Sequence, residues 1–195
     1  MKGQKTMVNI LMTIQSEHGV KRPIDDSLIL TVAKGDMDAF HELYESVSKS
    51  VYGFALSIIK NSHDAEDVLQ ETFLRIYASA DRYVPQGKPM AWIFTVTRNL
   101  AMSKLRENSR TAEYDESKPE KIDFTLVSDV EQRLVLEKVF TVLSDEEKQI
   151  LILHAVSGMK HREIASVLDM SVNTVLSKYH RAVKKLRIAV EEEQK

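Results

Sequence analysis

The chain has 195 residues, of which 43% are hydrophobic and 29% are charged, and it contains no cysteine. The lack of cysteine excludes disulfides, zinc fingers and cysteine nucleophiles. The formal net charge is −2, so a nucleic-acid partner would have to be bound by local patches rather than by the surface as a whole. Six glycines and four prolines leave a composition that favours an all-α protein.

The first half of the chain predicts four helices, each opened by a residue type that is common at helix starts. These residues are Asp25 with Asp26, Asp36, Ser62 and Pro89, and the helices end near Lys34, Asn61, Ser79 and Asn108. Residues 80–88, which contain a proline and a glycine, are predicted to form the loop before the fourth helix. Together these elements predict a small domain over residues 25–108, behind an N-terminal extension of residues 1–24 that has no assigned role.

The third helix combines an apolar stripe with an unusual outer face. Its predicted core residues, at helical spacing, are Ala65, Leu69, Thr72, Phe73 and Ile76. On the opposite face Leu74 stands among Asp67, Gln70 and Glu71. A leucine ringed by polar groups is typical of a protein contact, although a single exposed leucine is also common on an ordinary protein surface.

The fourth helix and the loop before it predict a surface for nucleic acid. The predicted inward stripe of the helix is formed by Ile93, Val96 and Leu100. Its outer face carries basic and amide groups with one apolar side chain among them, namely Arg98, Asn99, Met102 and Arg106. In the loop, Tyr83 is expected to be exposed and able to stack on an unpaired base, whereas Trp92 is expected in the core. The outer face also fits an ordinary solvated helix.

Residues 109–128 are polar and acidic without a helical period, and they predict a flexible linker. A second domain over residues 129–195 follows, with its first helix at residues 130–143. Ser144 and Glu147 form a capping box for the next helix, which ends at Gly158. The sequence therefore predicts an all-α fold of two small helical domains joined by a flexible linker.

The end of the chain predicts a helix-turn-helix. A short helix over residues 161–168, a tight turn at 169–171 and a longer helix from 172 to about 190 follow the order of that motif. The long helix has an apolar arc formed by Val172, Val175, Leu176, Tyr179, Ala182, Val183 and Leu186. The side chains predicted to bind duplex DNA are Ser171, Asn173, Thr174, Ser177, Lys178, Arg181, Lys184 and Lys185. Short hydrogen-bonding groups at the helix start can reach base edges, and the basic groups beyond them neutralise phosphates.

Three sets of motifs together resemble the extracytoplasmic-function (ECF) sigma factors of bacterial RNA polymerase. Residues 64–77 (DAEDVLQETFLRIY) resemble the helix of that family that binds core polymerase. Residues 89–101 (PMAWIFTVTRNLA) are similar to its promoter-melting helix. The C-terminal domain of the family is matched by LSDEE at 143–147, EIA at 163–165, NTV at 173–175 and HRA at 180–182. The resemblance covers residues 26–188 in the order of the family.

The resemblance implies a sigma factor that binds core RNA polymerase and directs it to promoter DNA. The polymerase would be contacted by Asp67, Gln70, Glu71 and Leu74. The melted minus-ten element, with a base flipped out of the stack, would be held by Tyr83, Lys88, Arg98, Asn99, Met102 and Arg106. The last helix would read the minus-thirty-five element as duplex through its polar side chains. A cytoplasmic location and an anti-sigma partner are also implied. Asn173 and Ser103 depart from the residues that are common in the family, which implies that this protein prefers a different promoter sequence.

Other classes of function find less support in the sequence. A phosphate-binding glycine loop, a nucleophile elbow and a His-Glu-x-x-His pattern are all missing, so no catalytic residue, metal ligand, cofactor or small-molecule substrate is predicted. No apolar run approaches the ~18 residues that insertion into a membrane requires. A helix-turn-helix repressor or activator that binds duplex DNA without polymerase would explain the C-terminal half, and a protein that binds an acidic partner would explain its basic face. Neither explains the motifs in the third and fourth helices.

Overall fold

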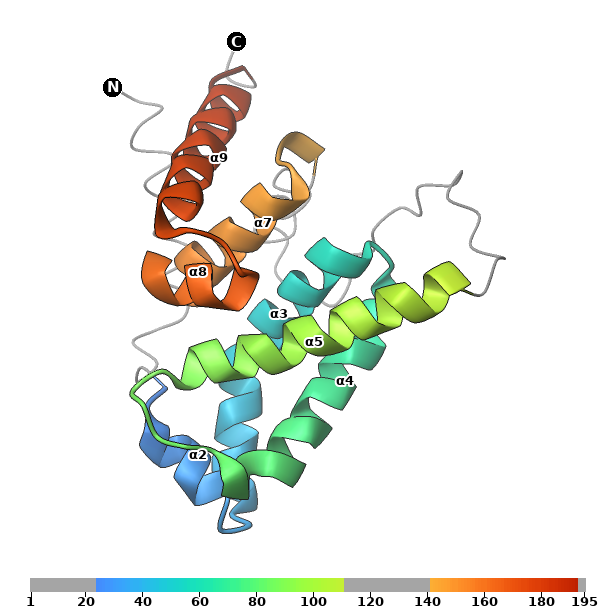
Figure 1. Cartoon of the computed structure of the whole chain (residues 1–195), viewed down its shortest axis with the longest axis vertical. Helices are drawn as coiled ribbons and strands as arrows, with labels where there is room; N and C mark the ends of the chain where they lie inside the picture. The colour runs from blue at the N-terminus through green and yellow to red at the C-terminus, as the bar shows by residue number, and fades with distance from the viewer. Residues whose placement is uncertain (1–23, 111–140, 193–195) are drawn as a thin grey trace. The chain divides into compact units, whose positions relative to one another are not determined.

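The computed structural model describes residues 24–110 and 141–192, and these two ranges form two separate compact units (Figure 1). All regular structure in both ranges is helical, which confirms the prediction of an all-α fold. The N-terminal extension, most of the predicted linker and most of the predicted helix at 130–143 lie outside the described residues. Within them, no helix is both long and apolar enough to cross a membrane.

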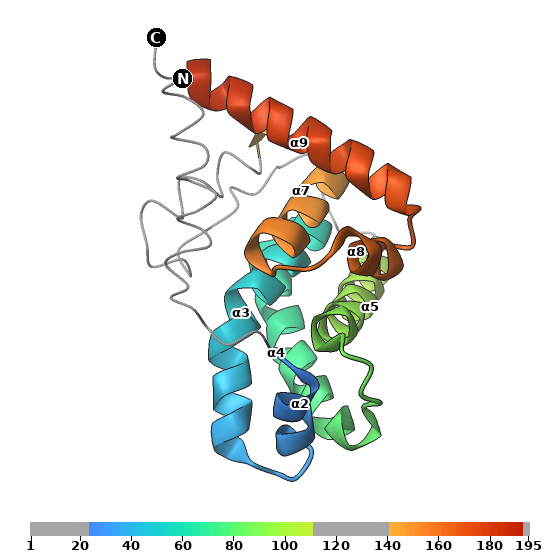
Figure 2. The ribbon, with the colours of Figure 1, turned by 90° about the vertical axis from the view of Figure 1, so that its left-hand side faces the viewer.

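The N-terminal unit is a small bundle of four helices. They are α2 (Asp26–Val32), α3 (Met37–Ile59), α4 (Ser62–Ser79) and α5 (Pro89–Arg110), with a 3₁₀ turn at Ala80–Arg82. Figures 1 and 2 show α3, α4 and α5 side by side, with α2 against the first part of α3. Because α5 continues to Arg110, Ser109 and Arg110, which were predicted to begin the linker, are helical.

Apolar side chains from all four helices meet in the core of this unit. The rings of Phe54 on α3 and Phe94 on α5 pack edge to face, with centroids 5.4 Å apart. The predicted stripe on α4 is confirmed, since Ala65, Leu69, Thr72, Phe73 and Ile76 are all buried. The predicted stripe on α5 is partly wrong. Its buried residues are Pro89, Ile93, Phe94, Thr97 and Ala101, because α5 packs against both α3 and α4 and so buries a wider face than one stripe.

Two helix starts differ from their predictions. Asp25 alone caps α2, accepting hydrogen bonds from the backbone of Ser27 and Leu28, while Asp26 is the first residue of the helix. The cap of α4 is Asn61 rather than Ser62, and its side-chain oxygen accepts the backbone N–H of Asp64 at 2.9 Å. Lys60 lies between α3 and α4 in the left-handed conformation, with φ of 63°. One residue is therefore enough to end α3, and the cap of α4 lies at Asn61, one position before Ser62.

The C-terminal unit contains the predicted helix-turn-helix. Its elements are α7 (Asp145–Leu151), which continues into one π-helical turn (Ile152–Val156), α8 (His161–Leu168) and α9 (Val172–Glu192). The capping box of α7 is confirmed in both directions. Asp169 adopts the left-handed conformation, with φ of 56°, and starts the tight turn between α8 and α9. The core of the unit includes Ile150, Leu153, Ile164, Val175 and Ala182.

Candidate functional site

An open groove with a volume of about 510 Å³ lies between the exposed faces of α4 and α5. Its α4 wall contains all four residues that were predicted to bind the polymerase, namely Asp67, Gln70, Glu71 and Leu74. Leu74 has 64% of its surface exposed, more than most large apolar residues in the described structure. The other wall is formed by Leu100, Ser103, Lys104 and Glu107 of α5. The groove therefore joins an unburied leucine to a rim of charged and amide groups.

Ion pairs hold the two walls of this groove together. The Lys104 ammonium group lies 3.2 Å from a carboxylate oxygen of Asp64 and 3.0 Å from one of Asp67. Hydrogen bonds to Asp67 and Asp64 raise the pKa of Lys104 above its ordinary value, so the ammonium stays charged. Along α4, Arg75 pairs with Glu71 at 3.0 Å. The groove is thus cross-linked at one end by Lys104 and open at Leu74.

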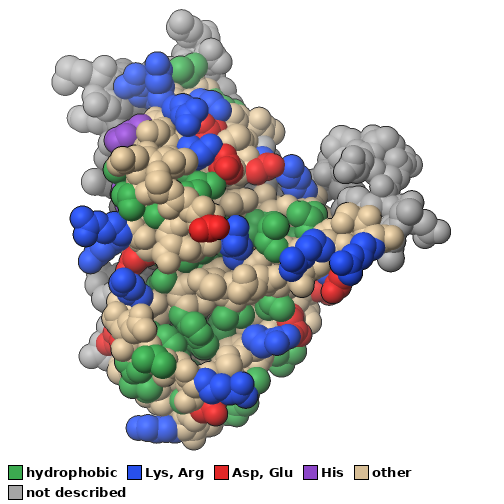
Figure 3. Space-filling view, in the orientation of Figure 1, with side chains coloured by type: hydrophobic (Ala, Val, Ile, Leu, Met, Phe, Trp, Pro, Cys, Tyr) green, Lys and Arg blue, Asp and Glu red, His purple; other side chains and the backbone are tan. Residues whose placement is uncertain are grey.

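The outer face of α5 carries the residues predicted to hold unwound DNA. Asn99, Met102 and Arg106 are exposed and Arg98 is half-buried. Basic side chains gather over the second half of the helix (Figure 3). Lys88, just before α5, is also exposed. A cationic face with an amide and an apolar side chain at its centre suits a nucleic-acid strand whose bases are unpaired.

Tyr83 is not the exposed loop residue that the sequence suggested, and that expectation is wrong. It is 8% exposed, and its ring packs on Trp92 with centroids 4.9 Å apart. Its hydroxyl donates a hydrogen bond to Asp26 on α2. Trp92 itself is half-buried rather than a full core residue. The apolar side chains that this loop does expose are those of Val84, at 65%, and Pro85.

The exposed side of α9 forms one continuous polar stripe. Its members are Asn173, Ser177, His180, Arg181, Lys184 and Arg187, all of them exposed, and basic side chains gather along this helix (Figure 3). His180 and Arg187 were not among the predicted DNA contacts, yet the 3.6-residue period that identified the others places them on the same face. Ser171 caps the helix instead, since its hydroxyl accepts the backbone N–H of Thr174 at 3.1 Å.

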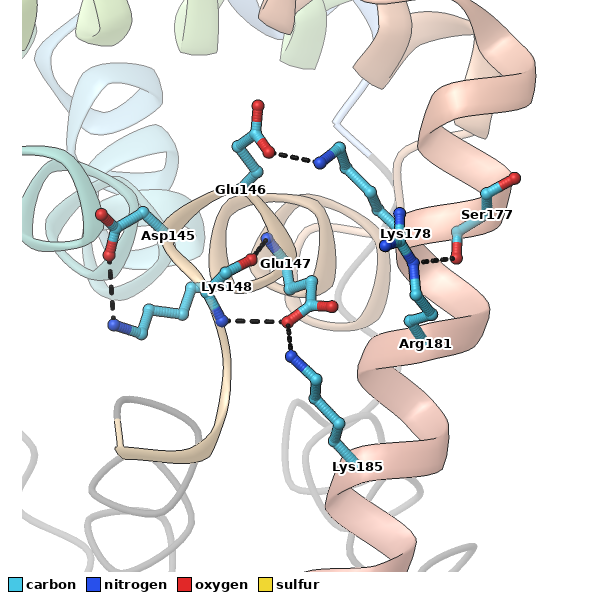
Figure 4. A network of polar contacts seen from close by, with 9 residues as sticks. Asp145, Glu146, Glu147, Lys148, Ser177, Lys178, Arg181 and Lys185 are labelled. Atoms are coloured by element: carbon cyan, nitrogen blue, oxygen red, sulfur yellow. Dashed lines mark hydrogen bonds and ion pairs between the residues drawn. The ribbon is translucent and has the colours of Figure 1, made fainter.

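Two lysines predicted to bind DNA point from α9 toward α7 (Figure 4). Lys178 pairs with Glu146, and the Lys185 ammonium lies 2.7 Å from a carboxylate oxygen of Glu147. Glu147 is 3% exposed. Burial by itself would raise its pKa, but the hydrogen bonds from Lys185 and the backbone of Ser144 outweigh burial, and the pKa of Glu147 is lowered. These lysines therefore tie the recognition helix to the start of α7.

A cluster of rings lies between the π-helical turn, α8 and α9. His154 and His161 are stacked with centroids 4.2 Å apart, and both rings pack on Tyr179 at 4.7 and 5.1 Å. His154 Nδ1 lies 2.8 Å from the carbonyl oxygen of Met159. His161 Nε2 is buried and has no hydrogen-bond partner among the described residues. Burial, together with the nearby His154 and His180, lowers the pKa of His161.

Acidification is therefore expected to destabilise the C-terminal unit. Below the ordinary histidine pKa of ~6.5, His161 becomes protonated in the unfolded chain but stays neutral in the folded one. The free energy of unfolding therefore falls as the pH falls from this value toward the lower pKa of folded His161. Amide protection factors in residues 150–182, which correct for intrinsic exchange, should be smaller at pH 5.5 than at 7.5. His161→Phe should remove most of this dependence, and His63→Gln, on an exposed site of α4, should leave it intact. Equal pH dependence in both variants would contradict the assignment to His161.

Known proteins resemble the chain in both units. Residues 43–111 match the family described as Sigma-70 region 2, and residues 133–186 match Sigma-70, region 4. The ECF RNA polymerase sigma factor EcfG of Rhodopseudomonas palustris is 33% identical over 70% of this chain and 77% of its own length. The ECF RNA polymerase sigma factor SigW of Bacillus subtilis is 24% identical over 82% of this chain and 92% of its own.

Two solved structures share the fold at 23% sequence identity each. CnrH, in complex with the cytosolic domain of CnrY, has a TM-score of 0.58 over 86% of this chain and 97% of its own. The sigma factor RpoE of Bartonella quintana, in complex with the anti-sigma factor NepR, has a TM-score of 0.57 over 78% and 96%.

Proposed function

The chain belongs to the ECF family of sigma-70 RNA polymerase sigma factors, and from this premise we propose how its two units divide the work of transcription initiation. As a member of that family it binds core RNA polymerase and directs initiation at specific promoters. The observation that carries the proposal is that the region 2 match coincides with the unit that holds the α4–α5 groove, and the region 4 match with the helix-turn-helix.

In the proposal, core polymerase docks on the groove between α4 and α5. Leu74 supplies the apolar anchor, and Asp67, Gln70 and Glu71 supply the polar rim around it. An apolar side chain at the centre of a polar rim is the usual anatomy of a protein interface, in which the centre contributes most of the affinity. Because Lys104 holds Asp67, this part of the rim is already ordered before the polymerase arrives.

The minus-ten element is held by the outer face of α5 and the loop before it. Lys88, Arg98 and Arg106 would neutralise phosphates, Asn99 would hydrogen-bond a base, and Met102 would contact a base face. Tyr83 has no direct part in this contact, because its ring is buried and its hydroxyl is engaged. Melting of the promoter requires side chains that bind unpaired bases more than side chains that hydrogen-bond base edges in duplex DNA.

The minus-thirty-five element is read as duplex by α9. Asn173, Ser177 and Arg181 lie on the exposed stripe, where a helix in the major groove presents its side chains to base edges. Lys184, His180 and Arg187 continue the same stripe and would contact phosphates. Ser171 and Thr174 serve this interface as the cap that shapes the start of the helix, and Lys178 and Lys185 serve it by fixing the helix to α7.

The protein is proposed to act in the cytoplasm, where core polymerase works, and to catalyse no reaction itself. Bond formation belongs to the polymerase, so neither a cofactor nor a small-molecule substrate is needed. An anti-sigma partner is proposed as well, because two of the solved structures similar to this chain are complexes, of CnrH with the cytosolic domain of CnrY and of RpoE with the anti-sigma factor NepR.

Transcription from a pool of genomic fragments of the host tests the function directly. Bacterial core polymerase alone should give no discrete start sites, whereas addition of the full chain should give a defined set that shares one minus-ten and one minus-thirty-five sequence. Sequencing of transcript ends from the pool makes the outcome independent of a guessed promoter. If the chain neither binds core polymerase nor directs transcripts, but binds palindromic duplex DNA tightly by itself, the proposal is wrong and a repressor is the better assignment.

A further inference from the structure

Asp26 connects α2 to the loop that precedes α5. One carboxylate oxygen accepts a hydrogen bond from the Tyr83 hydroxyl, and the other accepts one from the backbone N–H of Gly87 at 2.7 Å. These partners lie 57 and 61 residues further along the chain. Asp26 is not needed as the cap of its own helix, because Asp25 performs that role. Its two hydrogen bonds therefore serve the loop.

The loop is fixed at both ends and exposed between them. At its start the Tyr83 ring is buried against Trp92. Near its end Gly87 has a φ of 66°, a conformation that glycine adopts at little cost. Val84, Pro85 and Gln86 are exposed between these anchors, and Lys88 follows them. The loop is therefore exposed in its middle and anchored near both ends by the Asp26 carboxylate.

The hydrogen bonds to Asp26 are of the strong kind. Both have a charged acceptor, which makes a hydrogen bond shorter and stronger than one between neutral groups. Burial and the adjacent Asp26 carboxylate hold the pKa of Tyr83 above its ordinary value, so the phenol remains a donor. A loop ordered before binding loses less conformational entropy when it takes up a ligand.

We propose that Asp26 is a positioning residue for promoter melting, which holds Tyr83 and Gly87 so that the loop of residues 83–88 is preformed to accept an unpaired base of the minus-ten element. Asp26 acts through the loop and contacts no DNA. The inference rests on the proposed function of the α5 face. It differs from a purely structural role of Asp26 in predicting a defect confined to single-stranded DNA.

The test uses holoenzyme formed from core polymerase and the full chain. Its probe is a fluorescent single-stranded oligonucleotide carrying the non-template minus-ten sequence found in the transcription assay. Asp26→Asn and Tyr83→Phe should each weaken its binding about 5- to 10-fold, the scale of one hydrogen bond. Because both changes act on the hydrogen bond between Tyr83 and Asp26, which asparagine can form only as a weaker bond between neutral groups, the double variant should be little worse than either single one. Affinity for core polymerase and for minus-thirty-five duplex should stay at the wild-type level.

Asp25→Ala provides the matched control. It removes the cap of α2, one residue away, and destabilises the same helix, while the Asp26 carboxylate that bonds Tyr83 and Gly87 is kept. Wild-type binding by this variant supports the positioning role. A loss equal to that of Asp26→Asn, additive effects in the double variant, or wild-type binding by Asp26→Asn would each overturn it. If the wild-type holoenzyme itself fails to bind the oligonucleotide and to transcribe, the proposed function fails instead.

Discussion

Replacement of Leu74 by aspartate is expected to weaken the binding of core polymerase by about 30-fold or more, which is the scale of an interface hot spot. Leu74 is 64% exposed in the free chain and stands at the open end of the α4–α5 groove. Once the polymerase covers this groove, an aspartate there would be a desolvated carboxylate without a partner. Transcription from every promoter should fall together, because the loss precedes DNA recognition.

The fold should tolerate this change, so the loss of binding can be interpreted. An exposed helix position contributes little to stability, and the free energy of unfolding should change by about 0.5 kcal/mol. Met37→Asp is the matched control, since Met37 is 59% exposed on the same unit and does not line the groove. Titration of labelled variants with core polymerase gives both affinities. Equal losses for Leu74→Asp and Met37→Asp, or none for either, would contradict the docking site.

Lys184→Met and Lys185→Met are expected to impair different properties, DNA binding and stability respectively, although the residues are neighbours of the same type. Lys184 lies on the exposed stripe of α9, so its loss should weaken binding to the minus-thirty-five duplex about 3- to 10-fold. The slope of log affinity against log salt concentration should also become shallower by about one, as expected for one lost phosphate contact. Lys185 is paired with the nearly buried Glu147. Its loss should destabilise the C-terminal unit by about 1 kcal/mol, a value reduced because Lys185 is itself partly exposed.

Methionine suits both substitutions because it keeps the aliphatic stem that each lysine packs on the helix surface. Duplex affinity at several salt concentrations, and amide protection in residues 145–185, separate the two effects. Lys184→Met should change the first measurement and not the second, and Lys185→Met should change mainly the second. If Lys185→Met weakens DNA binding as much as Lys184→Met and leaves protection unchanged, then Lys185 leaves Glu147 to bind DNA.

Features that depend on neighbours within one or two helical turns were predictable from the sequence. The core stripe of α4, the capping box formed by Ser144 and Glu147, and the order of helix, turn and helix in residues 161–192 are all of this kind. A helical period states which residues share a face, and a cap acts over three residues. The α4 wall of the groove around Leu74 also followed from local spacing, because it is one face of one helix, whereas the α5 wall was not predicted.

Features that depend on another element of the fold were not predictable. The sequence determined an all-α chain, the faces of its helices and, through its motifs, the family to which it belongs. The tertiary structure decided which polar residues face solvent and which face a neighbouring helix. Tyr83 is buried because its ring packs on Trp92, and its hydroxyl can be buried because Asp26, 57 residues earlier, accepts a hydrogen bond from it. Lys185 differs from Lys184 because Glu147, 38 residues earlier, lies opposite it. A charge or hydroxyl has the same local pattern in either setting, and only the packing of distant segments fixes its partner.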